Sequence, residues 1–234
     1  ALPALMTGHS LGEWAALVCA GVVDFKDAVR LVQLRGKYMQ EAVPAGVGSM
    51  AAIIGLDDAT IIACCAAAAE REVVTAVNFN SPGQVVIAGN VAAVERACIL
   101  CKDQGAKRAQ LLMVSAPFHS SLLQPAADKL AEDISAISFS SPTIPVIHNV
   151  NASLESDPAR IKQLMIEQIY HPVLWVDCIN ALIKSGVDTF VECGPGKVLS
   201  GLTKRINRGL TSLAIESPEH LKHAASLFVI NNEK

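Results

Sequence analysis

The feature that most constrains this chain is the pentapeptide Gly8-His9-Ser10-Leu11-Gly12, close to its first residue. It matches the pattern G-x-S-x-G, in which a strand turns sharply into a helix and the serine occupies the corner. An apolar stretch precedes the pentapeptide, and a sequence with helical periodicity follows it. Glycines on both sides of Ser10 are expected to let strand and helix pass close together. Ser10 is therefore a candidate nucleophile; the alternative is an ordinary serine N-cap.

The helix predicted after this corner also bears on chemistry. Its N-terminus carries a partial positive charge, and the backbone N–H of Leu11 could face a developing oxyanion there. Glu13 is expected only to favour the first turn of this helix.

Beyond the corner, helical and strand patterns alternate along most of the chain. Helical periodicity and capping residues predict helices over residues 11–21, 25–42, 120–137, 157–169, 172–186 and 197–208. Apolar, β-branched runs predict strands over residues 144–150, 187–193 and 211–215. Strands that alternate with helices favour an α/β fold whose parallel sheet is covered on both faces.

Residues 45–114 have a different order of elements. Two strands, 73–79 and 84–89, are joined by the turn sequence Asn80-Ser81-Pro82-Gly83. The full predicted order is strand 49–56, helix 57–72, these two strands, helix 90–105 and strand 108–114. This βαββαβ order is the ferredoxin-like plan and is complete in itself. We therefore predict an inserted small domain at 45–114, with a core formed by 1–44 and 115–234.

Composition excludes several classes of protein. The 234 residues are 51% hydrophobic and 18% charged, which is typical of a globular chain. A net charge of −3 lacks the excess of basic residues that is typical of a nucleic-acid-binding protein. The longest apolar run, 61–69, is far shorter than the roughly 20 residues that a membrane-spanning helix needs. Seven cysteines without a framework spacing indicate reduced thiols and a cytoplasmic location. For the C-x-x-C pair Cys98 and Cys101, within a helical pattern, packing is favoured over redox chemistry.

A nucleophilic serine needs a base, and the chain has six histidines. His9 adjoins Ser10, but neighbouring side chains on such a corner point apart. His119 follows the predicted strand 108–114 and Pro117, at the start of a helix. In open α/β sheets, ligands bind where the carboxyl ends of the strands meet, so Ser10 and His119 could share one edge. No acid lies obviously behind the histidine, so a backbone or amide carbonyl could orient the imidazole instead.

Several segments together resemble one known family. They are, in order, "GHSLGEW", "LVQLRGKYMQEA", "NFNSPGQVVIAG", "SAPFHSSLL", "EQIYHPVLW" and "ECGPGKVLSGL". The chain resembles the malonyl-CoA:acyl carrier protein transacylases of bacterial fatty-acid synthesis, and the acyltransferase domains of polyketide synthases are similar. The resemblance implies an α/β-hydrolase-like core with a parallel sheet and an inserted ferredoxin-like domain, in agreement with the predicted elements.

The same resemblance implies catalytic roles at four positions. Ser10 matches the nucleophile that carries the malonyl ester, and His119 matches its base. Gln168 matches the residue whose main-chain carbonyl orients the histidine, and Leu11 supplies one oxyanion amide. The family's other oxyanion donor lies in an N-terminal "GQGSQ" motif that this sequence lacks, so we expect further residues to precede Ala1.

Substrate-binding residues also follow from the resemblance. Arg35 matches the arginine that holds the malonyl carboxylate, since a planar guanidinium binds a carboxylate in two places and a lysine cannot. Phe118, before the base, resembles the malonyl-selective form of this loop. Asn78 and His9 are further candidates for contact with substrate, whereas Asn80 is expected to shape its turn.

Together these features predict a ping-pong acyl transfer from malonyl-CoA to the phosphopantetheine thiol of acyl carrier protein. No metal or cofactor is implied. The expected partners are malonyl-CoA and acyl carrier protein, and the protein is expected to be a monomer. Two other functions remain open. A serine thioesterase or esterase would pass the acyl group to water, and a non-catalytic carrier-binding module would form no acyl ester.

Overall fold

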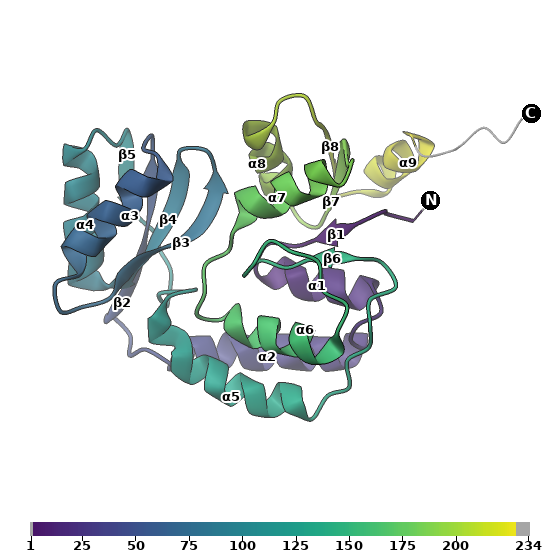
Figure 1. Cartoon of the computed structure of the whole chain (residues 1–234), viewed down its shortest axis with the longest axis horizontal. Coiled ribbons are helices and arrows are strands. Elements are labelled where there is room, and N and C mark those ends of the chain that lie inside the picture. The colour runs from purple at the N-terminus through teal and green to yellow at the C-terminus, as the bar shows by residue number, and fades with distance from the viewer. Residues whose placement is uncertain (1, 228–234) are drawn as a thin grey trace, which may run out of the picture.

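The computed structural model describes residues 2–227 and contains helices packed around parallel strands, with an antiparallel sheet to one side (Figure 1). Strand β1, Met6–Thr7, leads into the corner at Ser10 and then into helix α1, Leu11–Cys19. It pairs in parallel with β6, Val146–Ile147. A segment from near the start of the chain therefore lies beside one that follows it by about 140 residues.

A second parallel pair lies later in the chain. Strands β7, Thr189–Cys193, and β8, Thr211–Ile215, pair along their whole length. Three helices belong to the same part of the chain. They are α7, Trp175–Lys184, α8, Val198–Ile206, and α9, Pro218–Leu227. Within residues 2–227, the parallel strands form two separate pairs and not one continuous sheet.

The helices of the core lie in a layer below β1 and β6 in the view of Figure 1. Besides α1, this layer contains α2, Phe25–Glu41, α5, Gln124–Ser135, preceded by a 3-10 turn at Ser121–Leu123, and α6, Pro158–Glu167. Their apolar faces bury a cluster that includes Trp14, Leu17, Leu31, Leu130 and Ile161. Asp24 and Asp157 cap α2 and α6, each accepting a backbone N–H of the first turn.

The antiparallel sheet contains the strands of the predicted small domain. They are β2, Gly48–Ile54, β3, Val74–Ser81, β4, Gln84–Asn90, and β5, Arg108–Leu111. Helices α3, Asp58–Ala69, and α4, Val91–Asp103, lie at its outer side (Figure 1). The strand order β3-β4-β2-β5, with every neighbour antiparallel, is that of the ferredoxin-like plan. The predicted α/β fold with a βαββαβ unit is thus confirmed; the exact domain limits at 44/45 and 114/115 stay a prediction.

Both faces of this sheet are buried, which explains the unbroken apolar run of β4. Val85 and Ile87 pack with Ile53 against the helices α3 and α4. The alternate residues Val86 and Ala88 face the other way and, with Met50, Val77, Leu112 and Phe118, form a second apolar cluster. Since successive strand residues point to opposite faces, this second cluster brings the small sheet against the core.

Helix α7 begins later than the sequence predicts. The backbone N–H of Val173 donates to Val77 O at 2.8 Å, and Phe79 N–H donates to Val173 O at 3.0 Å. Val173 therefore extends along the edge of β3, and the helix starts only at Trp175. Asn90 precedes α4, but its side-chain oxygen accepts the N–H of Val73 instead of capping that helix.

Cys98 and Cys101 are buried on α4 against Cys64 and Cys65 of α3. Burial raises the pKa of the Cys101 thiol to about 12, so it stays protonated and unreactive near neutral pH. Among residues 2–227, no helix is both long enough and apolar enough to cross a membrane.

Candidate active site

The backbone at Ser10 is strained and is held in place by hydrogen bonds with Asn149. Ser10 has φ 52° and ψ −103°, in the region that favours glycine. The side-chain oxygen of Asn149 accepts the Ser10 N–H at 2.7 Å, and the Asn149 amide donates to Gly8 O at 2.7 Å. Ser10 sits at the N-cap position of α1, yet its side chain makes no capping hydrogen bond. The hydroxyl is thereby free to face elsewhere, unlike that of an ordinary N-cap.

Only one of the two flanking glycines is sterically required. A Cβ at Gly8 would collide with the backbone of Gly12 and with Glu13 N, closer than the 3.0 Å that real Cβ atoms keep. A Cβ at Gly12 would meet nothing within 4 Å. The expectation that both glycines permit the close approach therefore holds for Gly8 and is wrong for Gly12.

The structure brings Ser10 and His119 together from positions 109 residues apart. Ser10 Oγ lies 2.8 Å from His119 Nε2, and His119 Nδ1 lies 2.7 Å from the main-chain oxygen of Gln168. A carbonyl oxygen can only accept, so Nδ1 carries the proton and Nε2 is left as the acceptor for the serine hydroxyl. His119 is itself in a left-handed conformation, with φ 64°, and is 4% exposed.

Two features keep this imidazole neutral. Burial, the larger cause, and the nearby positive charge of Arg35 together lower the pKa of His119 to about 3. A neutral imidazole is the form that accepts a proton, so His119 is in the state a general base needs at neutral pH.

This shift predicts an unusual pH dependence. A histidine with a pKa of about 3 is only about 1% protonated at pH 5, so the kcat/KM of acyl transfer should stay nearly constant from pH 7 to about pH 5.

The same shift predicts a pH-dependent stability. In the unfolded chain His119 is protonated below about 6.5, whereas in the folded chain it stays neutral down to about pH 3. The free energy of unfolding should therefore fall as the pH drops from 6.5 toward 3. Rates measured with folding monitored by circular dichroism would check this, and a half-loss of kcat/KM near pH 6.5 in folded protein would contradict it.

Arg35 reaches the same hydroxyl from α2. Its Nη2 donates to Ser10 Oγ at 2.8 Å and to the side-chain oxygen of Gln168 at 3.2 Å. The side chain is 8% exposed, and burial lowers the pKa of Arg35 to about 10, so the guanidinium remains charged at neutral pH. Its buried Nε–H has no hydrogen-bond partner within the described part of the chain. A buried donor without an acceptor is costly, and the Arg35 side chain as a whole lines a cavity, where its guanidinium can meet an anion.

A cavity of about 350 Å³ lies over these groups. Its polar lining contains Ser10, His119 and Arg35, together with the predicted residues His9 and Asn78, and Phe118 adds an aromatic wall. The remaining lining is apolar: Met39, Met50, Val86, Leu112 and Val114. Sequence reasoning missed these, although Met39 follows Arg35 by one helical turn, and Met50 and Val86 alternate with residues of the small domain's core.

The other expected residues lie nearby in different roles. His9 Nε2 pairs with the Asn80 side-chain oxygen at 2.8 Å, and its ring centre lies 5.3 Å from that of Trp175. Asn80 belongs to β3, so the expectation that it shapes a turn is wrong; it holds His9 instead. The Leu11 side chain is 53% exposed, but its N–H belongs to the first turn of α1, where N–H groups have no acceptor within the helix.

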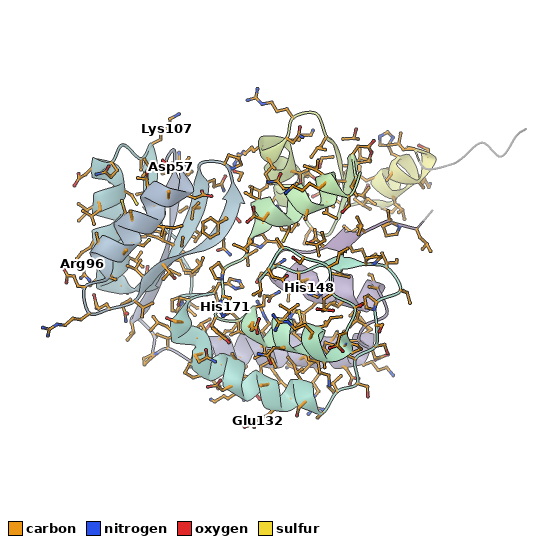
Figure 2. The ribbon with its side chains drawn as sticks, in the orientation of Figure 1. Asp57, Arg96, Lys107, Glu132, His148 and His171 are labelled. Atoms are coloured by element: carbon orange, nitrogen blue, oxygen red, sulfur yellow. The ribbon has the colours of Figure 1, made fainter. Side chains whose placement is uncertain are left out.

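A buried polar network beneath the cavity was not expected from the sequence. Glu13, 1% exposed, accepts hydrogen bonds from His148 Nδ1, the Asn149 N–H and the Gln168 amide. Figure 2 shows His148 in the interior of the core, whereas the labelled Arg96 and Lys107 lie at the periphery. The expectation that Glu13 acts only on its own helix turn is therefore incomplete. Its one sequence signal is an acid three residues after the nucleophile, which alone predicts only a helix start.

Fold and site together define a class of enzyme. A serine at a strained strand–helix corner, hydrogen-bonded to a neutral histidine that a carbonyl orients, is the arrangement of covalent acyl transfer through a serine ester. A guanidinium beside this pair is a group suited to binding an acyl group that carries a negative charge.

Comparison with known proteins identifies the family. A model of the acyl transferase domain matches residues 1–225, and the chain belongs to this family. The malonyl CoA-acyl carrier protein transacylase of Salmonella typhimurium is 57% identical over 223 residues, which are 95% of this chain and 72% of that protein. The Bacillus subtilis protein of the same name is 48% identical over 99% of this chain and 73% of its own length. The chain is thus an acyltransferase.

Solved structures agree in fold. The crystal structure of an acyl carrier protein S-malonyltransferase from Vibrio cholerae superimposes with a TM-score of 0.95 at 55% identity, covering 96% of this chain and 73% of that one. A malonyl-transacylase solved in complex with its type II polyketide synthase acyl-carrier protein gives a TM-score of 0.96 at 51% identity, covering 97% of this chain and 74% of that one.

Proposed function

We propose that this chain transfers the malonyl group from malonyl-CoA to the phosphopantetheine thiol of acyl carrier protein. The single observation that carries the choice of acyl group is Arg35: its charged guanidinium lines the cavity and contacts the Ser10 hydroxyl. A malonyl thioester ends in a carboxylate, which can accept from a guanidinium edge. An acetyl group has no carboxylate for this guanidinium to bind.

The first half of the reaction loads the enzyme. His119 Nε2 takes the Ser10 proton as Oγ attacks the thioester carbonyl, and the Leu11 N–H faces the oxyanion that forms. The carbon–sulfur bond then breaks, and coenzyme A leaves as a thiol after receiving the proton from His119. In the second half, His119 takes the proton of the carrier thiol, which attacks the seryl ester and releases Ser10 Oγ to be reprotonated. We propose that no cofactor is required, because nucleophile, base and anion donor are all side chains of this chain.

Partner and location follow from the same chemistry. The neighbour solved with an acyl-carrier protein, together with the relatives' names, supports a carrier protein as the acceptor of the malonyl group. We propose a cytoplasmic location, which is supported by seven cysteines that are all free thiols.

Intact-mass spectrometry would test the function. Mixing the protein with malonyl-CoA should give a malonyl ester on Ser10, and adding carrier protein with a free phosphopantetheine thiol should remove the ester and malonylate the carrier. Loss of the ester to water at the same rate without the carrier would indicate a thioesterase. Failure to form any ester would indicate a non-catalytic binding module.

Arg35→Ala should separate malonyl from acetyl donors. We expect the rate of malonyl loading to fall by about 100-fold or more, the cost of truncating one partner of a buried charge pair. Loading from acetyl-CoA, which has no carboxylate, should fall much less. Arg35→Lys should recover little of the malonyl rate, since an ammonium cannot reproduce the two-point contact. Equal losses with both donors would contradict the assignment of Arg35 to the carboxylate.

A further inference from the structure

We propose that Glu13 is a positioning residue for donor selection: it fixes the side-chain amide of Gln168 in one orientation, and that amide aims Arg35 at the acyl cavity. The inference rests on the proposed malonyl transfer and extends it to a residue that touches no substrate.

The first step of the argument is the completeness of the Glu13 site. Its Oε1 accepts from His148 Nδ1 at 2.7 Å. Its Oε2 accepts from Gln168 Nε2 at 2.6 Å and from the Asn149 N–H at 3.2 Å. A buried carboxylate with hydrogen bonds on both oxygens joins the start of α1, the chain after β6 and the end of α6. Glu13 therefore connects the elements that carry Ser10 and Gln168.

The second step concerns the orientation of the Gln168 amide. Its Nε2 lies against two groups that can only accept, the Glu13 carboxylate and the Ser10 main-chain oxygen, at 2.6 and 3.1 Å. Exchanging the amide oxygen and nitrogen would set an acceptor against both acceptors. The Glu13 carboxylate supplies the closer of the two contacts, at 2.6 Å against 3.1 Å for the Ser10 main-chain oxygen.

The third step leads from this amide to Arg35. With Nε2 held by Glu13, the Gln168 side-chain oxygen faces Arg35 Nη2 at 3.2 Å. The same Nη2 contacts Ser10 Oγ, and the Arg35 side chain lines the cavity. Gln168 thus fixes the position of the guanidinium that would bind the malonyl carboxylate. A flipped amide would present its N–H groups to the guanidinium, which has no acceptor.

Glu13→Gln removes the constraint with almost no change in shape. If the new amide keeps its oxygen toward His148, its nitrogen meets the donors of Gln168 and Asn149. If it turns around, its nitrogen can donate to His148 Nδ1 only when the histidine proton moves to Nε2, which is buried without a partner among the described residues. The first arrangement opposes donors, and rotating the Gln168 amide relieves this at the expense of its contact with Arg35; the second leaves a buried N–H on His148 unsatisfied.

The experiment compares loading of Ser10 from malonyl-CoA and acetyl-CoA by intact-mass kinetics. Glu13→Gln should lower the ratio of the malonyl rate to the acetyl rate by about tenfold, the typical cost of a misplaced buried hydrogen bond. Damage to the fold alone would lower both rates equally and leave the ratio unchanged, which would overturn the proposal. Glu192→Gln is the matched control, because Glu192 accepts the N–H groups of Leu199 and Ser200 at the start of α8, away from the cavity. Its ratio should equal that of the unaltered protein.

Two further variants test whether the effect of Glu13 on the malonyl-to-acetyl ratio passes through Gln168 and Arg35. Gln168→Met keeps the main-chain oxygen that orients His119 but removes the amide, so it should lower the ratio as Glu13→Gln does; it also carries the test if Glu13→Gln does not fold. In an Arg35→Ala background, Glu13→Gln should change the ratio less than about twofold, because residues acting through one contact are not additive. An unchanged ratio in Gln168→Met, or a tenfold change without Arg35, would overturn the proposal. Unaltered protein that loads no malonyl would instead refute the proposed function itself.

Discussion

Ser10→Ala should abolish acyl loading, with a loss of transfer rate on the order of 10⁴-fold or more. The Ser10 hydroxyl is the group proposed to form the ester, and alanine offers no hydroxyl to His119 or Arg35. His119→Ala should have an effect of similar size, because an unactivated serine is a weak nucleophile at neutral pH. The double variant should be scarcely slower than either single one, since the two side chains act as a unit.

The rates are to be measured as malonyl transfer to carrier protein, together with the intact mass of the enzyme. Ser200→Ala is a suitable control, because Ser200 is a buried serine whose hydroxyl donates to a main-chain oxygen, Leu213 O, and it lies on α8 outside the cavity. It should form the malonyl ester at the normal rate. Residual loading of Ser10→Ala above about 1% of normal would mean that another group carries the acyl ester.

Gly8→Ala should prevent stable folding, whereas Gly12→Ala should be tolerated or stabilising. The new Cβ at position 8 would collide with backbone atoms of Gly12 and Glu13, which cannot rotate away as a side chain can. We expect the free energy of unfolding to fall by about 4 kcal/mol or more, the range of severe overpacking. At position 12 the new methyl group meets open space within helix α1, and alanine favours a helix over glycine by roughly 0.5–1 kcal/mol.

Urea denaturation of both variants would measure the difference. The pair is its own control, because the two substitutions add the same methyl group on either side of Ser10. A Gly8→Ala variant within about 1 kcal/mol of the unaltered protein would show that the strand and helix can separate at this corner. The strained backbone of Ser10 would then not depend on their close packing.

Much of the fold could be predicted because it is encoded in local patterns. Alternating strand and helix periodicities indicated an α/β chain, and the complete βαββαβ order of the small sheet gave its topology. The start of α7 could not be predicted, since Pro172 is a favoured first residue of a helix. Only the pairing of Val173 with β3 shows why the helix starts later.

For the site, the sequence nominated the candidate groups. The corner motif marked Ser10, and the placement of His119 after a strand suggested a base, although that strand, β5, belongs to the antiparallel sheet and not to a parallel one. Residue type and local spacing thus nominated Ser10 and His119, whereas Arg35 and Gln168 were named through the family resemblance.

Tertiary structure alone decided how these groups meet. His119 reaches Ser10 across 109 positions, the Gln168 side chain bridges Glu13 to Arg35, and Met50 and Val86 close the cavity from the small sheet. The low pKa of His119 likewise arises from burial and from the Arg35 charge, neither of which is a property of neighbouring residues in sequence. Hydrogen bonds and Coulomb interactions act over a few ångströms of space, so contacts between distant segments exist only once the chain is folded.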